Sequence, residues 1–295
     1  MINFNKFYKL FNILSLSLVI ISILLLFFKG LNLGVDFKGG TLIELRANDK
    51  KINVTTLRYA FGNMTLGDIN VKKFGNERDF LIKIEKKDTS AKALEIIKKN
   101  LTDSIGSSFN FRRVENVGPK VSSELLKSGI IAIVLSLAAM LFYIWIRFEW
   151  QFSLGAILAL FHDVIITLGF FSLFNLEINL SIVAAVLTIV GYSMNDTVVI
   201  FDRVRENLIK FSDIKIFELT NISINETLSR TIITSVTTLL ALISIYFFGG
   251  EILKGFSLAM IMGVVFGTYS SIYIANPILV KLRVSQKTIL KEDTE

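Results

Sequence analysis

The sequence predicts an all-α membrane protein: a bundle of six transmembrane helices that carries one small α+β domain of ferredoxin-like topology. Hydrophobic residues make up 52% of the 295 residues and charged residues only 19%, and the mean hydropathy is +0.59. Soluble domains carry about 25% charged residues, so a soluble two-domain protein is not expected. The absence of cysteine excludes disulfides, thiolate metal sites and a cysteine nucleophile.

Six apolar runs are long enough to cross a bilayer, since a helix needs about 20 residues to span about 30 Å of hydrocarbon. They cover residues 7–28, 129–146, 152–173, 180–201, 232–248 and 256–280. The first run has a basic start, Lys6 and Lys9, as a signal peptide would. It is too long for the apolar core of a signal peptide, and no small residues mark a cleavage site. We therefore predict an uncleaved span.

The placement of lysine and arginine predicts the orientation. These residues gather at the amino end, after the second span, between the fourth and fifth spans and in the tail, whereas the short loops opposite contain only Lys254. Both termini are therefore expected in the cytoplasm. The predicted domains are a cytoplasmic N-terminus with the first span (1–29), an exported domain (30–127), the remaining five spans with a cytoplasmic loop at 202–230 (128–281), and a cytoplasmic tail (282–295).

Segment 30–127 has the pattern of a folded domain. Strand-like runs cover 41–46, 68–74, 79–84 and 108–114, helical spacing covers 54–64 and 90–105, and Gly75-Asn76 is a turn dipeptide. The order β-α-β-β-α-β is that of a ferredoxin-like unit, a fold that hosts many functions. The segment carries 18 basic and 12 acidic residues, and the whole chain has a net charge of +7. Most of the positive charge is thus expected outside the cytoplasm, which disfavours binding to nucleic acid.

Polar residues inside the spans are the candidates for function, because an ionisable side chain in the bilayer costs about 2.5–3.5 kcal/mol. The fourth span contains Asn195 and Asp196. If Asn225 caps the fifth span, Arg230 lies at a depth similar to that of Asp196, and Thr234 continues its face. Such an Asp–Arg pair is either a static link between two helices or a proton carrier whose occupancy depends on the separation of the charges.

The third span contains His162 and Asp163 near its middle. As consecutive residues of a helix they are expected to point in different directions and need not act together. The histidine is either a hydrogen-bonding group between helices or part of a proton relay. In the sixth span, small residues recur at four-residue steps from Gly263 to Ala275, which indicates a close-packing face.

Several familiar enzyme motifs are absent from the sequence. The phosphate-binding pattern G-x-x-x-x-G-K-[ST], the zinc motif H-E-x-x-H and the nucleophile motif G-x-S-x-G do not occur. We expect a transport subunit and not an enzyme, without cofactor or bound metal. Energy for transport would come from an ion gradient or from another subunit.

Motifs along the whole chain resemble the SecF subunits of the bacterial SecD/SecF family, which are relatives of the RND transporters. The motifs are Leu33-Gly-Val-Asp-Phe-Lys-Gly-Gly40, Val117-Gly-Pro-Lys-Val-Ser-Ser-Glu-Leu125, His162-Asp-Val164, Ala184-Ala-Val-Leu-Thr-Ile-Val-Gly-Tyr-Ser-Met-Asn-Asp-Thr-Val-Val199, Phe201-Asp-Arg-Val-Arg-Glu-Asn207, Asn225-Glu-Thr-Leu-Ser-Arg-Thr231, Thr237-Thr-Leu-Leu240 and Phe266-Gly-Thr-Tyr-Ser-Ser271. Ser122 departs from the glycine that the family commonly has there.

The resemblance implies a fold, a function and partners. It implies an RND-like half that pairs with SecD to complete twelve helices in the bacterial inner membrane, with residues 30–127 in the periplasm. It implies that the proton-motive force helps to draw preproteins outward after the ATP-driven step. The implied partners are the SecYEG translocon with SecA, together with YajC and YidC. It implies that Asp196 and Arg230 take part in proton passage. The full set of residues that we expect to conduct protons is Asp196, Arg230, Asn195, Thr197, Thr234, Asp163 and His162.

Two other functions remain open from the sequence, and so does the coupling ion. A small-molecule efflux half-transporter would need large external domains, and this chain offers one modest domain. A scaffold that only binds translocon components would tolerate neutral replacements of Asp196 and Arg230. One carboxylate does not distinguish H⁺ from Na⁺.

Overall fold

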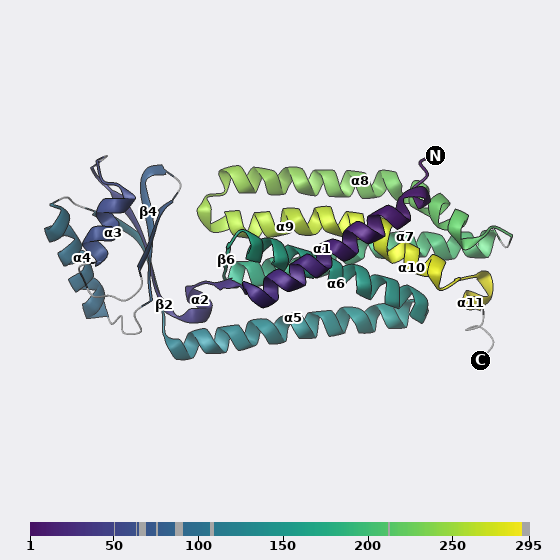
Figure 1. Cartoon of the computed structure of the whole chain (residues 1–295), viewed down its shortest axis with the longest axis horizontal. Coiled ribbons are helices and arrows are strands. Elements are labelled where there is room, and N and C mark those ends of the chain that lie inside the picture. The colour runs from purple at the N-terminus through teal and green to yellow at the C-terminus, as the bar shows by residue number, and fades with distance from the viewer. Residues whose placement is uncertain are drawn as a thin grey trace. The chain divides into compact units, whose positions relative to one another are not determined.

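The computed structural model describes residues 1–49, 51–62, 64, 69–74, 76–85, 91–106, 109–211 and 213–290. The chain divides into two compact units. The membrane unit comprises Met1–Asn32, Ala132–Leu176 and Ser181–Glu295, and the sheet unit comprises Leu33–Ile131 and Glu177–Leu180. Figure 1 shows the long helices of the first unit and the small sheet with its covering helices in the second.

Six spans that are long and apolar enough to cross a membrane confirm the predicted fold class. The first five are α1 (Tyr8–Phe28), α5 (Pro119–Arg147), α6 (Trp150–Leu173), α7 (Leu180–Lys210) and α8 (Ile216–Phe248), and the sixth begins with α9 (Glu251–Ser270). A 3-10 turn, η1 (Asn5–Phe7), precedes α1, and a short helix, α11 (Gln286–Leu290), follows the last span.

The fifth span begins much earlier than the sequence predicted. Helix α8 starts at Ile216, so Asn225 lies inside the helix, and the prediction that Asn225 caps the span is wrong. The Asn225 side-chain amide donates to the carbonyl oxygens of Ile2 and Asn221, each at 2.8 Å. It therefore fastens the N-terminal segment to α8 instead of starting a helix. Arg230 consequently lies close to the midpoint of α8.

The sixth span is interrupted by a π-helical turn, η2 (Ser271–Ala275), before it continues as α10 (Asn276–Lys281). Pro277 explains the interruption, because proline lacks an N–H and its ring clashes with the carbonyl four residues earlier. The Asn276 side-chain amide donates to the Ser271 carbonyl oxygen at 2.7 Å and so satisfies a backbone group in the widened turn. Single π turns of this kind are frequent at functional sites.

Helices α6, α7 and α9 form the interior of the membrane unit, whereas most of the apolar surface of α1, α5 and α8 is exposed. Glycines allow α7 and α9 to approach closely. A Cβ on Gly263 would collide with the Ile189 side chain, and one on Gly267 would lie 3.1 Å from the Cβ of Ser193. The first part of the predicted small-residue face of the sixth span is therefore packed against α7.

The sheet unit has the predicted element order. It contains β2 (Gly40–Ala47), α3 (Val54–Gly62), β3 (Ile69–Phe74), β4 (Asn76–Ile84), α4 (Ala91–Ile105) and β5 (Phe109–Val117). The sheet order is β3-β4-β2-β5, with every pair antiparallel, as a ferredoxin-like unit requires. Of the predicted turn, Gly75 lies outside the described residues and Asn76 begins β4. The sheet unit also contains the short elements α2 (Val35–Lys38) and β6 (Glu177–Ile178), and β1 (Asn32–Leu33) lies at its start.

The sheet packs its apolar face against α3 and α4. Ile43 of β2 pairs with Ile82 of β4 and Val114 of β5. Ile43 and Ile82 are buried together with Leu57 of α3 and Leu101 of α4. This alternation of buried positions along β2 and β4 explains why the sequence pattern was sufficient to locate these strands.

An ion pair links β2 and β4 at the end of the sheet. Arg46 Nε and Nη2 donate to the two carboxylate oxygens of Asp79 at 2.5 and 2.7 Å, and Arg112 Nη1 lies 3.6 Å from Asp79 Oδ2. The guanidinium of Arg46 holds the pKa of the Asp79 carboxyl below its usual range. This pair cross-links neighbouring strands, because Arg46 and Asp79 are register partners.

The glycine pair at the junction of α2 and β2 has a structural reason. Gly39 and Gly40 have φ values of 79° and 127°, which side-chain-bearing residues rarely adopt. A Cβ on Gly40 would also lie 2.5 Å from the carbonyl oxygen of Ile84. The two glycines thus let the chain turn sharply from α2 into the sheet.

Candidate functional site

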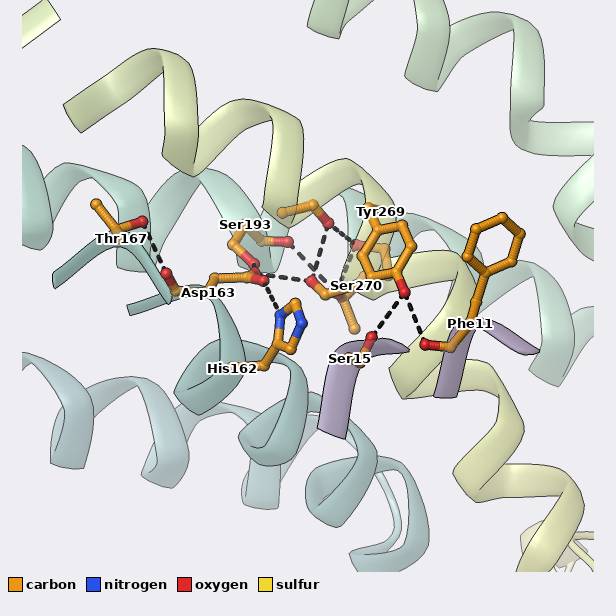
Figure 2. Close-up of polar contacts among 11 residues, drawn as sticks. Phe11, Ser15, His162, Asp163, Thr167, Ser193, Tyr269 and Ser270 are labelled. Atoms are coloured by element: carbon orange, nitrogen blue, oxygen red, sulfur yellow. Dashed lines mark hydrogen bonds and ion pairs between the residues drawn. The ribbon is translucent and has the colours of Figure 1, made fainter. Parts of the chain in front are cut away.

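Asp163 of α6 lies fully buried within the membrane unit and accepts hydrogen bonds from two other helices. Its Oδ2 accepts from Ser193 Oγ of α7 at 2.5 Å and from Ser270 Oγ of α9 at 2.7 Å. Figure 2 shows the carboxylate between these hydroxyls and the ring of His162. A buried carboxyl is tolerated only when hydrogen bonds replace its hydration, so this arrangement explains how the third span accommodates an acid.

His162 and Asp163 act as a pair, contrary to the expectation from their adjacency in the helix. His162 Nδ1 lies 2.8 Å from Asp163 Oδ1. The expectation considered only where the Cβ atoms point, whereas rotation about the side-chain bonds brings the ring back to its neighbour. The imidazole also stacks on Tyr269, with the ring centroids 5.9 Å apart.

Tyr269 extends this cluster to the first span. Its hydroxyl donates to the Phe11 carbonyl oxygen at 2.9 Å and lies 2.7 Å from Ser15 Oγ, as Figure 2 shows. Four spans therefore meet at the cluster, which we call the Asp163 cluster: α1, α6, α7 and α9.

Asp196 of α7 belongs to a second cluster that joins α7, α8 and α9. Thr268 Oγ1 lies 3.3 Å from Asp196 Oδ2 and 2.8 Å from Ser235 Oγ of α8. Arg230 acts on Asp196 electrostatically, but within the described part of the chain the two form no ion pair. The structure therefore does not contain the static Asp–Arg link that was one of the two interpretations.

The other predicted residues have different surroundings. Thr197 is buried, and its Oγ1 lies 2.9 Å from Ser271 Oγ at the start of the π turn. Thr234 donates to the carbonyl oxygen of Arg230, in its own helix, at 2.9 Å. Asn195 is exposed on the outer surface of α7.

Sequence reasoning missed the hydroxyl groups that hold the two acids. Ser193 lies three residues before Asp196 on α7, but it bonds to Asp163 of α6. Thr268 and Ser270, two residues apart on α9, each bond to a different acid. The run Thr268-Tyr-Ser-Ser271 inside an apolar span was the available signal, because so many hydroxyls together in a membrane helix indicate polar partners.

The carboxyl groups of Asp163 and Asp196 are the groups in the two clusters that can bind and release a proton. A carboxyl group accepts hydrogen bonds when ionised and donates one when protonated, and hydroxyls can do both. Each acid contacts α9, so the protonation state of either one changes the bonding of the same helix.

Comparison with known families gives two matches. The profile described as "Protein export membrane protein SecD/SecF, C-terminal" matches residues 97–285, and that of the "SecD/SecF GG Motif" matches residues 24–50. The second match contains Gly39 and Gly40, whose conformation requires glycine.

Individual relatives and solved structures agree with these matches. A protein translocase subunit SecF from Rickettsia bellii is 46% identical over 94% of this chain and 92% of its own length. A protein of the same name from Calditerrivibrio nitroreducens is 45% identical over 95% of this chain and 93% of its own length. The crystal structure of SecDF from Thermus thermophilus has a TM-score of 0.85 and 36% identity over 95% of this chain. A SecDF structure in the super-membrane-facing form has a TM-score of 0.71 and 35% identity over 99% of this chain.

The present chain spans 38% and 40% of those two SecDF chains, so it corresponds to only part of each. With six candidate membrane spans, a ferredoxin-like unit, and both family profiles matched, the chain is a multi-pass membrane protein that belongs to the SecD/SecF family.

Proposed function

We propose that this protein is a SecF-type subunit of the bacterial Sec export machinery and uses the proton-motive force, together with SecD, to complete the translocation of preproteins across the inner membrane. The observation that carries the proposal is the pair of acids inside the bundle, Asp163 and Asp196, each bonded to hydroxyls of α9. Membrane-embedded acids of this kind mark proton relays. The relatives named as translocase subunits support export, and nothing favours small-molecule efflux.

Proton coupling would operate through Asp196 and Arg230. When Asp196 takes up a proton it loses its negative charge, and its attraction for Arg230 disappears. Helix α8, which carries Arg230, is then free to shift against α7 and α9. Release of the proton on the other side of the membrane restores the charge and reverses the shift. A proton gradient would thus drive a cycle of helix movements that is passed to the exported domain at residues 30–127.

The polar surface of α7 and α8 supports a six-span partner. Thr188, Gly191 and Asn195 are exposed on α7, and Arg230 and Thr237 are exposed on α8. An arginine near the middle of a membrane helix is costly when it faces lipid. We infer that SecD covers this surface, since transporters of repeated six-span halves place the ion path at the interface between the halves.

The remaining parts of the proposal follow from the same assignment. The termini would lie in the cytoplasm and residues 30–127 in the periplasm, in keeping with the placement of lysine and arginine. SecYEG with SecA would deliver the preprotein, and YajC and YidC would be further partners. The chain itself would act as a transport subunit and not as an enzyme.

The test compares Asp196→Asn with Asp202→Asn in the reconstituted complex with SecD. Asp202 is the matched control, because it lies on the same helix but is only partly buried and is paired with Arg147 at 2.8 Å. Asp196→Asn should abolish gradient-dependent proton flux and gradient-dependent export while the complex still assembles, and Asp202→Asn should retain both. Normal flux and export with Asp196→Asn would refute the proposal and would support a scaffold role.

A further inference from the structure

A groove of about 800 Å³ opens on the membrane unit between α1, α6 and α10. Apolar side chains make up most of its wall, among them Ile13 and Leu16 of α1, Leu158 and Phe161 of α6, and Ile278 of α10. These side chains are part of the surface that the bundle presents to the bilayer, so hydrocarbon is the natural content of the groove.

Two lysines stand at one end of this groove. Lys9 is in the first turn of α1 and Lys281 is the last residue of α10, and both line the groove. Both are exposed, and neither forms an ion pair with any residue that the structure describes. None of the groove's lining residues is acidic. The groove therefore combines an apolar wall with two cations that have no counter-charge among the residues that the structure describes.

The position of the lysines fits the headgroup level of a membrane. Helix α1 begins and α10 ends at the end of the bundle where the N-terminus lies (Figure 1). This end carries most of the lysine and arginine of the membrane unit, which favours the cytoplasmic leaflet. Basic pockets between transmembrane helices on that side bind the phosphate groups of anionic lipids.

His162 supplies a second, independent observation. It is 3% exposed, it lines the groove, and its Nε2 has no hydrogen-bond partner in the described part of the chain. Its other nitrogen bonds to Asp163. The groove thus reaches from the two lysines to an unpartnered polar atom of the Asp163 cluster.

We propose that this groove is a specific binding site for one anionic glycerophospholipid, with the phosphate between Lys9 and Lys281 and an acyl chain along α1 and α6. The inference does not depend on proton coupling, since it rests on the wall of the groove and its charges. A lipid bound in the groove would contact the His162 side chain. Through His162 it would affect the Asp163 cluster from the bilayer side.

The experiment measures lipid retention by the purified full chain in detergent, using native mass spectrometry. The probes are phosphatidylglycerol and phosphatidylcholine with identical acyl chains. One phosphatidylglycerol should be retained per chain, and Lys9→Gln with Lys281→Gln should weaken its binding about 30-fold with little change for phosphatidylcholine. The control pair Lys210→Gln with Lys287→Gln removes two cations that do not line the groove, and it should leave binding unchanged.

Two further arms distinguish other occupants. Inorganic phosphate in excess should not displace the lipid, because the apolar wall supplies much of the affinity. Since the chain has no cysteine, Leu16→Cys gives a single attachment point for a photo-crosslinker in native membranes, and it should capture lipid. Equal retention of the two lipids, equal losses in both lysine pairs, displacement by phosphate, or capture of a protein helix would each overturn the proposal.

Discussion

The hydrogen bond between Ser193 and Asp163 offers a direct test of the Asp163 cluster. The perturbation is a double-mutant cycle made of Ser193→Ala, Asp163→Ala and the double variant. In the structure Ser193 Oγ donates to Asp163 Oδ2 at 2.5 Å, and both side chains are buried. If this bond links α6 to α7, the serine should matter only while the aspartate is present.

The structure sets the expected size of the effect. Interhelical hydrogen bonds in membrane proteins contribute about 0.6 kcal/mol on average and up to about 1.7 kcal/mol. Because this bond is short and buried, we expect it to lie in the upper half of that energy range, with a coupling free energy of about 1–1.7 kcal/mol. Asp163→Ala also removes the acceptor for Ser270 and for His162. Three lost bonds of this size amount to about 3–5 kcal/mol in the free energy of unfolding.

The assay is reversible unfolding of the purified chain in mixed micelles, with denaturing detergent as the titrant and tryptophan fluorescence as the signal. Ser244→Ala is the control, because Ser244 is exposed on α8 and, among the described residues, its hydroxyl bonds only to the Leu240 carbonyl oxygen of its own helix. Its coupling to Asp163→Ala should be zero. The reasoning is refuted if Ser193→Ala destabilises the Asp163→Ala background as much as it destabilises the original chain.

Two further predictions concern packing and charge. Asp79→Asn should speed hydrogen exchange in β2 and β4 at neutral pH, because it weakens the pair with Arg46. Because the pKa of Asp79 is lowered in the folded state, its ionised carboxylate stabilises the fold fully above the unfolded-state pKa. This stabilisation is lost as the pH falls through the folded-state pKa. Hydrogen exchange in the Asp79→Asn variant should lack this acid dependence. Gly263→Val should destabilise the bundle by about 1–3 kcal/mol through collision with Ile189, as measured by detergent unfolding, whereas Gly191→Ala, with nothing within 4 Å, should be neutral. An unaffected Gly263 variant would contradict the close packing of α7 and α9.

Hydropathy located the membrane spans but not the ends of their helices. It marks residues that suit hydrocarbon, so the polar first turns of α5, from Pro119, and of α8, from Ile216, lay outside the predicted runs. A helix continues past the bilayer wherever its backbone hydrogen bonds and tertiary contacts persist. The contact of Asn225 with Ile2 is such a case, and no local pattern could indicate a partner more than 200 residues away.

The strands were predictable for a complementary reason. In the sheet unit one face of each strand is buried, and the alternation of Ile43, Leu45, Phe80 and Ile82 with more polar residues records that burial directly in the sequence. The membrane unit has no sequence pattern that distinguishes buried from exposed positions, since residues that face lipid and residues that face other helices are both apolar. The choice of Ser193 and Ser270 as partners of Asp163 depends on the relative rotation of three helices, which their separate sequences do not specify.

The π turn η2 means that the sixth span cannot be drawn on one helical wheel. An α-helix advances by about 100° per residue, so a single wide turn shifts the phase of everything that follows it. Small residues on one nominal stripe then meet different neighbours: Gly263 abuts Ile189 of α7, whereas the Ala275 carbonyl lies beside Gly155 of α6. A π turn holds one residue more than the α-helical turn it replaces, so a one-residue deletion should be tolerated best within Ser271–Ala275, where it would restore a regular α-helix and leave Lys281 beside the groove.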